Sequence, residues 1–588
     1  MATKKKIDEL ANYWMSEIKG GLDYRKKYST RDRWDDFRKY YRGQWAAGLI
    51  PVNKIFSFGR MLIPKVYFRA PRVTVTPTKP DMIWHAKVVE SIDNTLIRET
   101  FLKNTLKRSA LDGYLCGVGP IKLGYDSQFG YIPEQAAGDD GATVTQVSKK
   151  EGDRIEYEVG VKPGMPWALR TRPEDVVVPW GSEDPNSIPW IAHYILRPLD
   201  DVMQDQKYKE SALKELKGTR TPALEDNKKV EFRPRHQRDK VTQYAELWEI
   251  RDCKSKQMIV LCEDQVLLST PDVLQIEGLP WEFITFNPDP EYFWGIPDAH
   301  ILEPQQLELN ETRTQASRHR AIALLKFLYK EGAFTKEELA KFLSGEVGIA
   351  VSIKDVDNIA AAITMVQPHI PPDLYRESMA IVQDMREELG FSQNQEGAFS
   401  PYHGKTATET MTVAQAFEDR IDERRDIVGD TIQRIVRKWN QFIFNFWTEK
   451  KVVQITSPQG EPFWVEYTGD QIEGEYFLNL DVESGMPITR PLKYQMGQEL
   501  MKTFGGDPLI NQVLLRQISL DNYAIIDPRV SNLLLAQPGI DTQAEAGKRQ
   551  PSPAHGGGGK GSVGGRQGSS PEKPMEFEDA KKKFEQGR

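Results

Sequence analysis

The feature that most constrains the fold of this chain is a long helical segment with almost no apolar side chains in its middle. Residues 298–329 are predicted to form one helix, which would be about 48 Å long at about 1.5 Å per residue. Its middle, from Glu308 to Arg320, reads ELNETRTQASRHR. A helix that is polar all round has no face to bury in an ordinary core. We therefore expect this segment to face solvent, a channel or a polar partner.

A second long helix is predicted over residues 408–448, and this one carries a sustained apolar stripe. Its large apolar residues recur every three or four positions, which is the spacing of one helix face. They are Phe417, Ile421, Val428, Ile432, Ile435, Trp439, Phe442 and Phe446. This face should be buried in the core. Helical spacing also predicts shorter helices over residues 4–45, 82–112, 199–217, 371–389 and 489–535.

Short runs of β-branched and aromatic residues lie between the predicted helices and indicate strands. Two apolar runs, Val241–Ile250 and Met258–Cys262, are joined by a polar turn and predict a β-meander over residues 241–268. Other predicted strands are Val73–Thr76, Val176–Val178, Trp190–Leu196, 452–467 and 476–483. This mixture predicts an α+β fold. The 588 residues exceed the roughly 250–300 at which a single core stops growing, so we expect several regions.

The C-terminal tail, residues 538–588, is expected to lack order. It contains Gly556–Gly559, several prolines and few large apolar residues, so it cannot bury enough surface to offset its chain entropy. Within the tail, the stretch from Phe577 to Phe584 could form a short charged helix on binding.

The overall charge of the chain is acidic, with a net charge of −7 and a pI of about 5.8. Tight DNA binding usually requires a basic face, because neutralisation of phosphates drives affinity. The composition therefore argues against a general tight DNA binder. No stretch approaches the roughly 20 apolar residues of a membrane span, and the N-terminus lacks the apolar core of a secretory signal. Three cysteines provide neither a disulfide framework nor a zinc cluster.

One basic cluster, Lys228–Lys240 (KKVEFRPRHQRDK), stands out in this acidic chain. It would suit contact with DNA or with a negatively charged partner. A solvated loop is the alternative, and we favour it because runs of charge are usually just exposed.

Motifs for catalysis are weak throughout the chain. Gly404-Lys405-Thr406 ends like a phosphate-binding loop, but Phe399 occupies the position of the required earlier glycine. Gly117-Val118-Gly119 lacks the third glycine of a dinucleotide site. The histidines show no metal-ligand spacing, and the acidic pairs Asp35-Asp36 and Asp200-Asp201 suit helix starts better than a nuclease metal site. The sequence therefore predicts no enzyme activity, no metal and no cofactor.

Six segments of the chain are informative through their order and spacing, although none of them is specific by itself. They are Tyr40–Trp45, Pro51–Pro77, Ser109–Asp126, Arg172–Pro179, Leu279–Arg313 and Gly404–Met411. The fifth is the most informative, because a strand leads through an aromatic-Gly-x-Pro turn into a long helix with Gln and Asn on its polar face. In this order the segments resemble the portal proteins of tailed double-stranded DNA bacteriophages, over residues 1–537.

The resemblance implies a multi-region portal fold that assembles as a ring, commonly a dodecamer. The implied regions are a wing at 1–197, a first stem helix at 198–225, a clip at 226–294, a second stem helix at 295–329, a wing return at 330–390, a tunnel loop at 391–407, a long inner helix with wing strands at 408–484, a crown at 485–537 and a disordered tail at 538–588. Helix 298–329 would then pack beside copies of itself around a channel.

The same resemblance implies that the ring is a DNA channel at one capsid vertex, used in packaging and ejection. Implied partners are further copies of the chain, double-stranded DNA, the terminase, the major capsid protein and head–tail adaptor or tail proteins. The implied location is the virion, after assembly in the host cytoplasm, with no membrane contact.

Three sets of residues are implied to carry this function. The tunnel-loop residues that would touch passing DNA are Gln393, Asn394, Gln395 and Lys405. The residues that would line the stem are Glu308, Asn310, Arg313, Gln315 and Arg318. The residues that would dock partners on the clip are Lys228, Lys229, Arg233 and Arg235.

Two other classes of protein stay open at this point. One is another structural protein of the head–tail junction, although adaptors are usually much shorter. The other is a metal-dependent DNA-processing enzyme, which would cleave DNA in the presence of magnesium.

Overall fold

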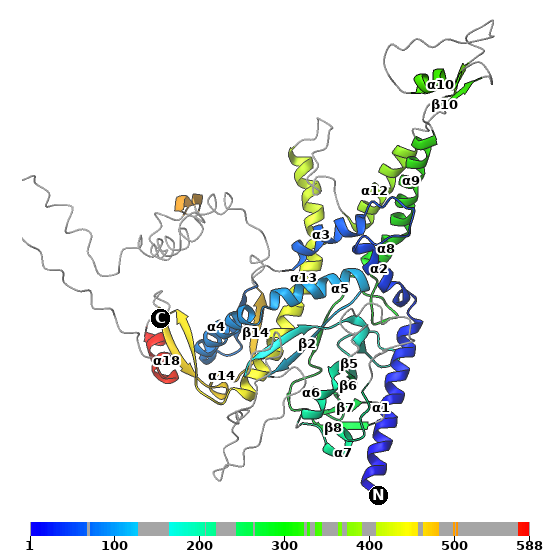
Figure 1. The fold of residues 1–588 in the computed structure, drawn as a ribbon. Helices are drawn as coiled ribbons and strands as arrows, with labels where there is room; N and C mark the ends of the chain where they lie inside the picture. The colour runs from blue at the N-terminus through cyan, green and yellow to red at the C-terminus, as the bar shows by residue number, and fades with distance from the viewer. Residues whose placement is uncertain are drawn as a thin grey trace, which may run out of the picture.

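The structure is a computed structural model of the chain, and Figure 1 shows its fold. It describes residues 2–67, 71–126, 164–205, 207–218, 243–262, 265–322, 326–329, 335–343, 363–366, 373–390, 407–456, 462–480, 498–499, 501–503 and 574–586. Helices and small antiparallel sheets alternate along these residues, which confirms the predicted mixed α+β class.

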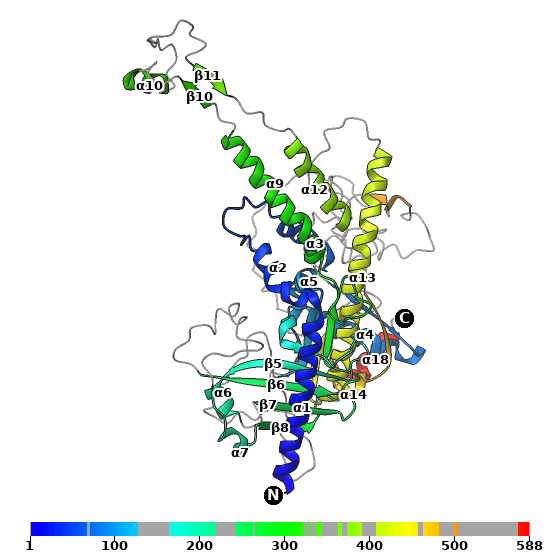
Figure 2. The same ribbon diagram turned by 90° about the vertical axis from the view of Figure 1, so that its right-hand side faces the viewer.

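The described residues form a body, which contains most of the sheets, and a pair of helices that projects from it (Figures 1 and 2). The projecting pair consists of α9 (Glu303–Ile322) and α12 (Asp373–Leu389). The elements at its far end are β10 (Lys326–Tyr329), α10 (Lys336–Leu343) and β11 (Ile363–Val366), and β10 pairs with β11. The body therefore consists of segments that come before and after this projection in the sequence.

Helix α13 (Ala407–Phe446) is the longest described helix and forms the centre of the main core. The apolar stripe predicted for it is buried from Ile421 to Phe442, and the Phe446 ring stacks on Tyr125 at 4.6 Å. The side chain of Phe417 lies outside the described residues. The body elements in contact with α13 include α3 (Lys54–Val66), α4 (Ile83–Glu99) and two strands, β3 (Pro166–Arg170) and β9 (Trp281–Ile284).

A five-stranded antiparallel sheet has the order β4-β5-β6-β7-β8. The last three strands of this sheet, β6, β7 and β8, confirm the β-meander predicted within 241–268. Strand β5 pairs with β6 from Trp190↔Asp252 to Pro198↔Tyr244, so strands from both sides of the boundary predicted at residue 197 share this sheet. The five strands are β4 (Val176–Val177), β5 (Trp190–Pro198), β6 (Tyr244–Asp252), β7 (Gln257–Cys262) and β8 (Gln265–Pro271).

A three-stranded antiparallel sheet, in the order β3-β2-β9, contacts both α13 and α5 (Leu102–Cys116). Strand β2 (Gly119–Tyr125) follows α5 directly and is buried along its whole length. A Cβ atom at position 119 would overlap the backbone carbonyl of Ser109, so only glycine permits this close approach of strand and helix.

A buried ion cluster joins these two sheets. Lys122 on β2 donates to Glu249 on β6 at 2.7 Å, and the Arg251 guanidinium lies 3.3 Å from the same carboxylate. Burial would raise the pKa of Glu249, but Lys122 and Arg251 more than offset it and lower this pKa to about 2. A buried charge with its partner removed is strongly destabilising, so the cluster fixes how the sheets sit against each other.

The helix predicted over residues 82–112 is present, but it is divided into two separate helices, α4 and α5. Phe101, between them, has a φ of 52° and is 66% exposed. A left-handed residue redirects the chain, and apolar periodicity does not reveal it. The separation turns α5 toward the strand that follows it.

The single helix predicted over residues 199–217 is wrong. The structure has two short helices, α6 (Leu199–Gln204) and α7 (Glu210–Leu213). Between them, the Asp205 carboxylate accepts hydrogen bonds from the Lys207 backbone N–H at 3.1 Å and from the Arg197 guanidinium at 2.8 Å. A side chain that binds nearby backbone in this way competes with a continuous helix.

The helix predicted over residues 298–329 is shorter and interrupted. One turn, α8 (Asp298–Ile301), precedes α9, and Pro304 lies in the first turn of α9, where a missing N–H is tolerated. Residues Lys326–Tyr329 form strand β10 and not helix, because they pair with β11. That partner is distant in the sequence, so local periodicity could not reveal it.

The N-terminal helices predicted over residues 4–45 are present in three pieces, α1 (Ala2–Lys27), a 3-10 turn η1 (Ser29–Arg33) and α2 (Trp34–Tyr41). Helix α1 lies against the five-stranded sheet, where Trp14 meets Trp190 at 5.7 Å. Asp35 and Asp36 occupy the first turn of α2, and Asp200 and Asp201 the first turn of α6, as predicted.

The end of the chain returns to the body, where the short charged helix expected at Phe577–Phe584 is present, whereas residues 538–573 of the tail lie outside the described residues. Helix α18 (Phe577–Gln586) packs on a hairpin and on α4 (Figure 1). The hairpin consists of β12 (Lys451–Thr456) and β13 (Pro462–Tyr467), followed by α14 (Gly469–Ile472). Strand β1 (Val73–Pro77) pairs with β14 (Tyr476–Leu480) nearby. Most of the helix predicted over 489–535 lies outside the described residues.

Candidate functional site

The projecting pair contains the polar helix that the sequence singled out. Helices α9 and α12 run antiparallel (Figure 2), because Gln305 near the start of α9 donates to Glu388 near the end of α12. The apolar side chains that the two helices bury are Leu309, Ala316, Ile381, Met385 and Leu389. Only a narrow apolar strip is buried on each helix, so most of the surface of the pair is polar.

One face of α9 is polar and yet buried, because it binds the backbone of the segment that leads into α3. Gln306 is fully buried. Its Oε1 atom accepts hydrogen bonds from the backbone N–H groups of Lys54 at 2.8 Å and Ile55 at 3.2 Å. Its Nε2 atom donates to the carbonyl of Val52 at 2.9 Å. One side chain thus satisfies three backbone groups at the start of α3.

The same face continues one and two helical turns further along α9. Asn310 Oδ1 accepts from the Val52 N–H at 3.0 Å, and Thr314 Oγ1 accepts from the Ile50 N–H at 2.9 Å. We call Gln306, Asn310 and Thr314 the polar ladder. Asn310 is fully buried within a single chain, so its predicted role in lining a channel is wrong. The polar helix does meet a polar partner, but much of that partner is backbone of the same chain.

The other four residues predicted to line the stem lie on the solvent-facing side of α9. Glu308, Arg313, Gln315 and Arg318 are all exposed in the isolated chain. Helix α9 therefore has two polar faces, the buried polar ladder and this exposed surface.

Charge along α9 changes sign from the body to the tip. Glu303, Glu308 and Glu311 lie in its first half, and Arg313, Arg318 and Arg320 lie in its second half. This order agrees with the helix dipole, which favours anions near the N-terminus and cations near the C-terminus. The exposed surface is therefore acidic near the body and basic near the tip.

A buried ion pair fixes the base of the projection to α13. The Arg424 guanidinium donates to both oxygens of Asp298, at 2.7 and 2.8 Å, and the Asn287 amide donates to Asp298 at 3.1 Å. Burial would lower the pKa of Arg424, but the Asp298 carboxylate more than offsets burial and raises it. Two-pronged pairing of this kind restricts orientation as well as distance. The direction of α9 is therefore coupled to that of α13.

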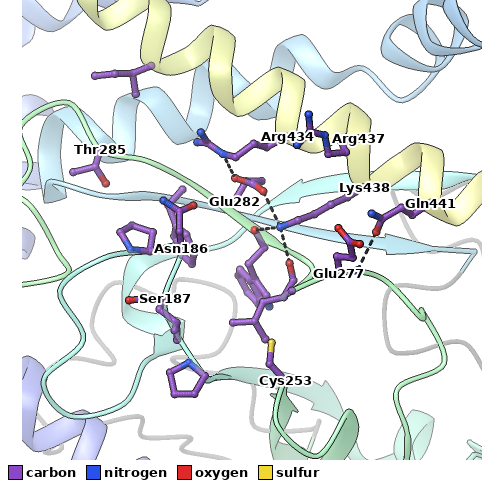
Figure 3. A pocket seen from close by; sticks show the side chains of 18 residues that line it. Asn186, Ser187, Cys253, Glu277, Glu282, Thr285, Arg434, Arg437, Lys438 and Gln441 are labelled. Carbon is purple, nitrogen blue, oxygen red and sulfur yellow. Dashed lines mark hydrogen bonds and ion pairs between the residues drawn. The ribbon is translucent and has the colours of Figure 1, made fainter. Parts of the chain in front are cut away.

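A cleft of about 640 Å³ lies where α13 passes the loops beside β9 (Figure 3). Arg434 and Lys438 reach into it from α13, and each lies 2.7 Å from the buried carboxylate of Glu282 on β9. Lys438 also donates to the carbonyls of Leu279 and Trp281 at 2.7 and 2.9 Å. The charges of Arg434 and Lys438 are thus compensated by Glu282 of the same chain. The cleft is polar, but these two cations do not make it a binding site for an anion.

Burial keeps the thiol that lines the cleft in its neutral form. Cys253 lines the cleft, and burial raises the pKa of its thiol, which disfavours the thiolate. In the part of the chain that the structure describes, no group of three or more His, Cys, Asp or Glu side chains could hold a metal ion. None of the described helices combines the length and the apolar character needed to cross a bilayer.

Two of the predicted residue sets lie outside the described residues. They are Gln393, Asn394, Gln395 and Lys405, of the predicted tunnel loop, and Lys228, Lys229, Arg233 and Arg235, of the predicted clip. These predictions remain as the sequence states them.

Sequence reasoning missed the polar ladder and the ion pair at the base of α9. The ladder has a signal, since an amide, an amide and a hydroxyl recur at intervals of four residues in a helix with few apolar residues. The Asp298–Arg424 pair and the Glu282 cluster have none, because their members are far apart in the sequence.

Comparison with known proteins returns no match, either to a protein-family model or to a curated protein.

Proposed function

We propose that this chain is a subunit of a bacteriophage portal, a ring through which double-stranded DNA enters and leaves a capsid. The observation that carries the proposal is the projecting pair α9–α12, which leaves the body and exposes a charged helix face in the isolated chain. A projecting helix pair with an exposed charged face has no partner for that face within its described chain, whereas copies packed side by side can enclose a polar channel. The ordered sequence segments of the portal family support the same proposal.

Within this proposal the stem and clip differ from those inferred from the sequence. We assign the stem to α9 and α12, and the clip to residues 323–372 between them. Two antiparallel helices that flank a projecting end suit a stem better than residues 198–225, whose described part forms two short helices against the body. Residues 226–294 do not suit a clip, because their described strands belong to the body sheets.

Helix α13 suits the role of the long inner helix. It begins at Ala407, immediately after the proposed tunnel loop, and its first part rises beside the projecting pair (Figure 2). Its later part is buried in the main core, and Arg424 links it to the base of the pair. Movement of the tunnel loop would therefore be transmitted to the stem through a rigid element.

The exposed charges of the pair suit passage without tight binding. Arg313, Arg318 and Arg320 could contact phosphates, whereas Glu308 and Glu311 would repel them. Phosphate contacts carry no sequence information, so such a surface accepts any DNA.

The experiment that tests the proposal is native mass spectrometry of the purified full-length chain, together with negative-stain images. We expect a closed ring of about a dozen copies with a central hole, as symmetric homo-oligomers close on themselves. A monomer, or a dimer without a hole, at concentrations up to tens of micromolar would overturn the proposal. Incubation with plasmid DNA and magnesium distinguishes the enzyme alternative, and we expect no cleavage.

A further inference from the structure

We infer that residues 574–586 are a tethered docking peptide, and that the groove formed by α4 and β13 is its recognition site. Residues 504–573, which include Gly556–Gly559, separate this segment from the preceding described residues. Figure 1 shows α18 beside the hairpin at the edge of the body. The inference does not depend on the proposed function.

The first contact adds a strand residue to the hairpin. Met575 forms a parallel bridge with Val465, with its N–H donating to the Trp464 carbonyl at 2.9 Å. The Met575 carbonyl accepts from the Glu466 N–H at 2.8 Å. Strand β13 uses its other edge to pair with β12, so Met575 occupies an edge that would otherwise be open. Addition of a strand to an open edge is a common mode of peptide recognition.

The second contact is the apolar face of α18. Phe577, Ala580 and Phe584 are at most 6% exposed and recur at helical spacing. The charged residues of the other face, which include Glu578, Asp579, Lys582 and Glu585, are exposed. A helix with one buried face and one charged face is typical of a peptide that lies in a groove.

The groove is lined by aromatic rings of the body. Trp84 on α4 and Phe463 on β13 stack on each other, with centroids 6.1 Å apart. Phe577 and Phe584 meet the Trp84 ring at 5.8 and 5.2 Å. Because α4 and the hairpin pack against each other directly, the groove walls do not require α18.

The fit of the segment is specific at its centre. Ala580 is fully buried, so a large side chain at this position would clash with the groove. Together with Met575, Phe577 and Phe584, it defines the pattern Met-x-Phe-x-x-Ala-x-x-x-Phe. An isolated helix of ten residues is marginal in water, so the groove is what makes α18 helical.

A ligand joined to its site by a Gly-rich chain binds as a separable unit. The link makes binding intramolecular, so the attached segment is present at the groove at an effective concentration set by the length of the link, and it competes with the same peptide added in solution. The segment should therefore leave and return without unfolding of the body.

The test uses the full-length chain with Phe577→Ala and Phe584→Ala, and a fluorescent synthetic peptide of residues 574–586. We expect the peptide to bind this variant at least tenfold more tightly than it binds the wild-type chain, by fluorescence anisotropy. The matched control, Glu578→Ala with Glu585→Ala, changes the exposed face of the same helix and should behave as wild type. A peptide carrying Ala580→Arg should not bind.

Equal peptide binding to wild type and to the phenylalanine variant, or no binding to either, would overturn the inference. A second measurement avoids dependence on the variant. Hydrogen exchange of the wild-type chain should be at least tenfold faster in α18 than in β12 and β13, but slower than in the free peptide. Exchange of α18 at the same rate as the hairpin would show that the segment opens only with the body, and would also overturn the inference.

Discussion

Asp93 is a carboxylic acid in the interior of the body whose hydrogen bonding is incomplete. It lies on α4 with no exposed surface, and its Oδ2 atom accepts from the Asn440 amide at 3.2 Å. Its Oδ1 atom has no hydrogen-bond partner within the described part of the chain. Burial raises the pKa of this carboxyl well above its ordinary value, against the opposing hydrogen bond from Asn440. The folded state therefore favours the neutral acid.

This raised pKa predicts how Asp93→Asn changes stability with pH. The stability that comes from the neutral acid is fully present below the unfolded pKa of about 4 and is lost as pH rises toward the folded pKa. Asparagine does not titrate, so at pH 7 we expect Asp93→Asn to raise the free energy of unfolding by about 1–3 kcal/mol, because the wild-type carboxylate must take up a proton on folding and each unit of raised pKa costs about 1.4 kcal/mol. The gain should shrink toward pH 4, measured by urea denaturation at several pH values.

The control for this prediction is Asp8→Asn, at an exposed position of α1. It should change the free energy of unfolding by less than about 0.5 kcal/mol at any pH in this range. A gain from Asp93→Asn that is independent of pH would contradict the argument, because it would not arise from titration.

Single residues differ in how far the sequence foretells their environment. Ile432 and Trp439 are predicted and found in the core, because apolar spacing alone decides which helix face is buried. Asp93 and Asn440 are buried polar residues whose position depends on the meeting of two distant helices. Asn310 is a third case, since it was assigned to an exposed surface and lies inside the chain.

At the scale of elements, the sequence predicts which helices and strands form better than it predicts where they begin and end. Helices α12 and α13 match their predicted ranges closely, because each has a clear apolar stripe, and α12 is followed by a left-handed glycine, Gly390. Predictions were wrong where a contact distant in the sequence decides the outcome. Strand β10, for example, requires β11, whose residues come only after α10. Local pattern carries no information about such partners.

The polar ladder predicts a specific effect of Asn310→Ala. The variant removes the acceptor of the Val52 N–H and leaves a partly buried donor unsatisfied, which costs about 1 kcal/mol or somewhat more. We expect hydrogen exchange of the Val52 amide to rise at least tenfold, measured by mass spectrometry of peptides that cover the segment before α3. Unchanged exchange there would mean that α9 does not hold this segment.

The matched control is Gln315→Ala on the exposed face of the same helix. Its amide bonds only to Glu311 among the partners that the structure records, at 3.2 Å. It should leave exchange of the Val52 amide unchanged, which separates loss of the ladder from a general weakening of α9.

The whole molecule is a body interrupted by one long excursion, and only part of that organisation follows from the sequence. The order of helices and strands was largely predictable, and so was the presence of several regions. The boundaries between the regions were not predictable, because the five-stranded sheet contains strands from both sides of the boundary predicted at residue 197. The proposed function depends on which segment projects from the body, and only the folded chain reveals this.

If the chain forms a ring, charge reversal on the exposed face of α9 should alter DNA passage and not assembly. We expect Arg313→Glu with Arg318→Glu to form rings of wild-type mass, but to lower DNA retention several-fold in reconstituted capsids. Acidic side chains repel phosphates, and the effect should weaken at high salt. The control Lys19→Glu, at an exposed position of α1, should retain DNA as wild type does. Wild-type retention by the double variant at low salt would exclude these arginines from the channel.

The pairing of β1 with β14 has a consequence for the order of events during synthesis. Strand β1 (Val73–Pro77) pairs with β14 (Tyr476–Leu480), so β1 has no partner in this sheet while roughly 400 further residues are made. At ordinary rates of translation this takes roughly 20–80 s. The projecting pair is complete on the ribosome before this sheet can close. The body of the protein therefore finishes folding late, with β1 unpaired by β14 until about four-fifths of the chain has been made.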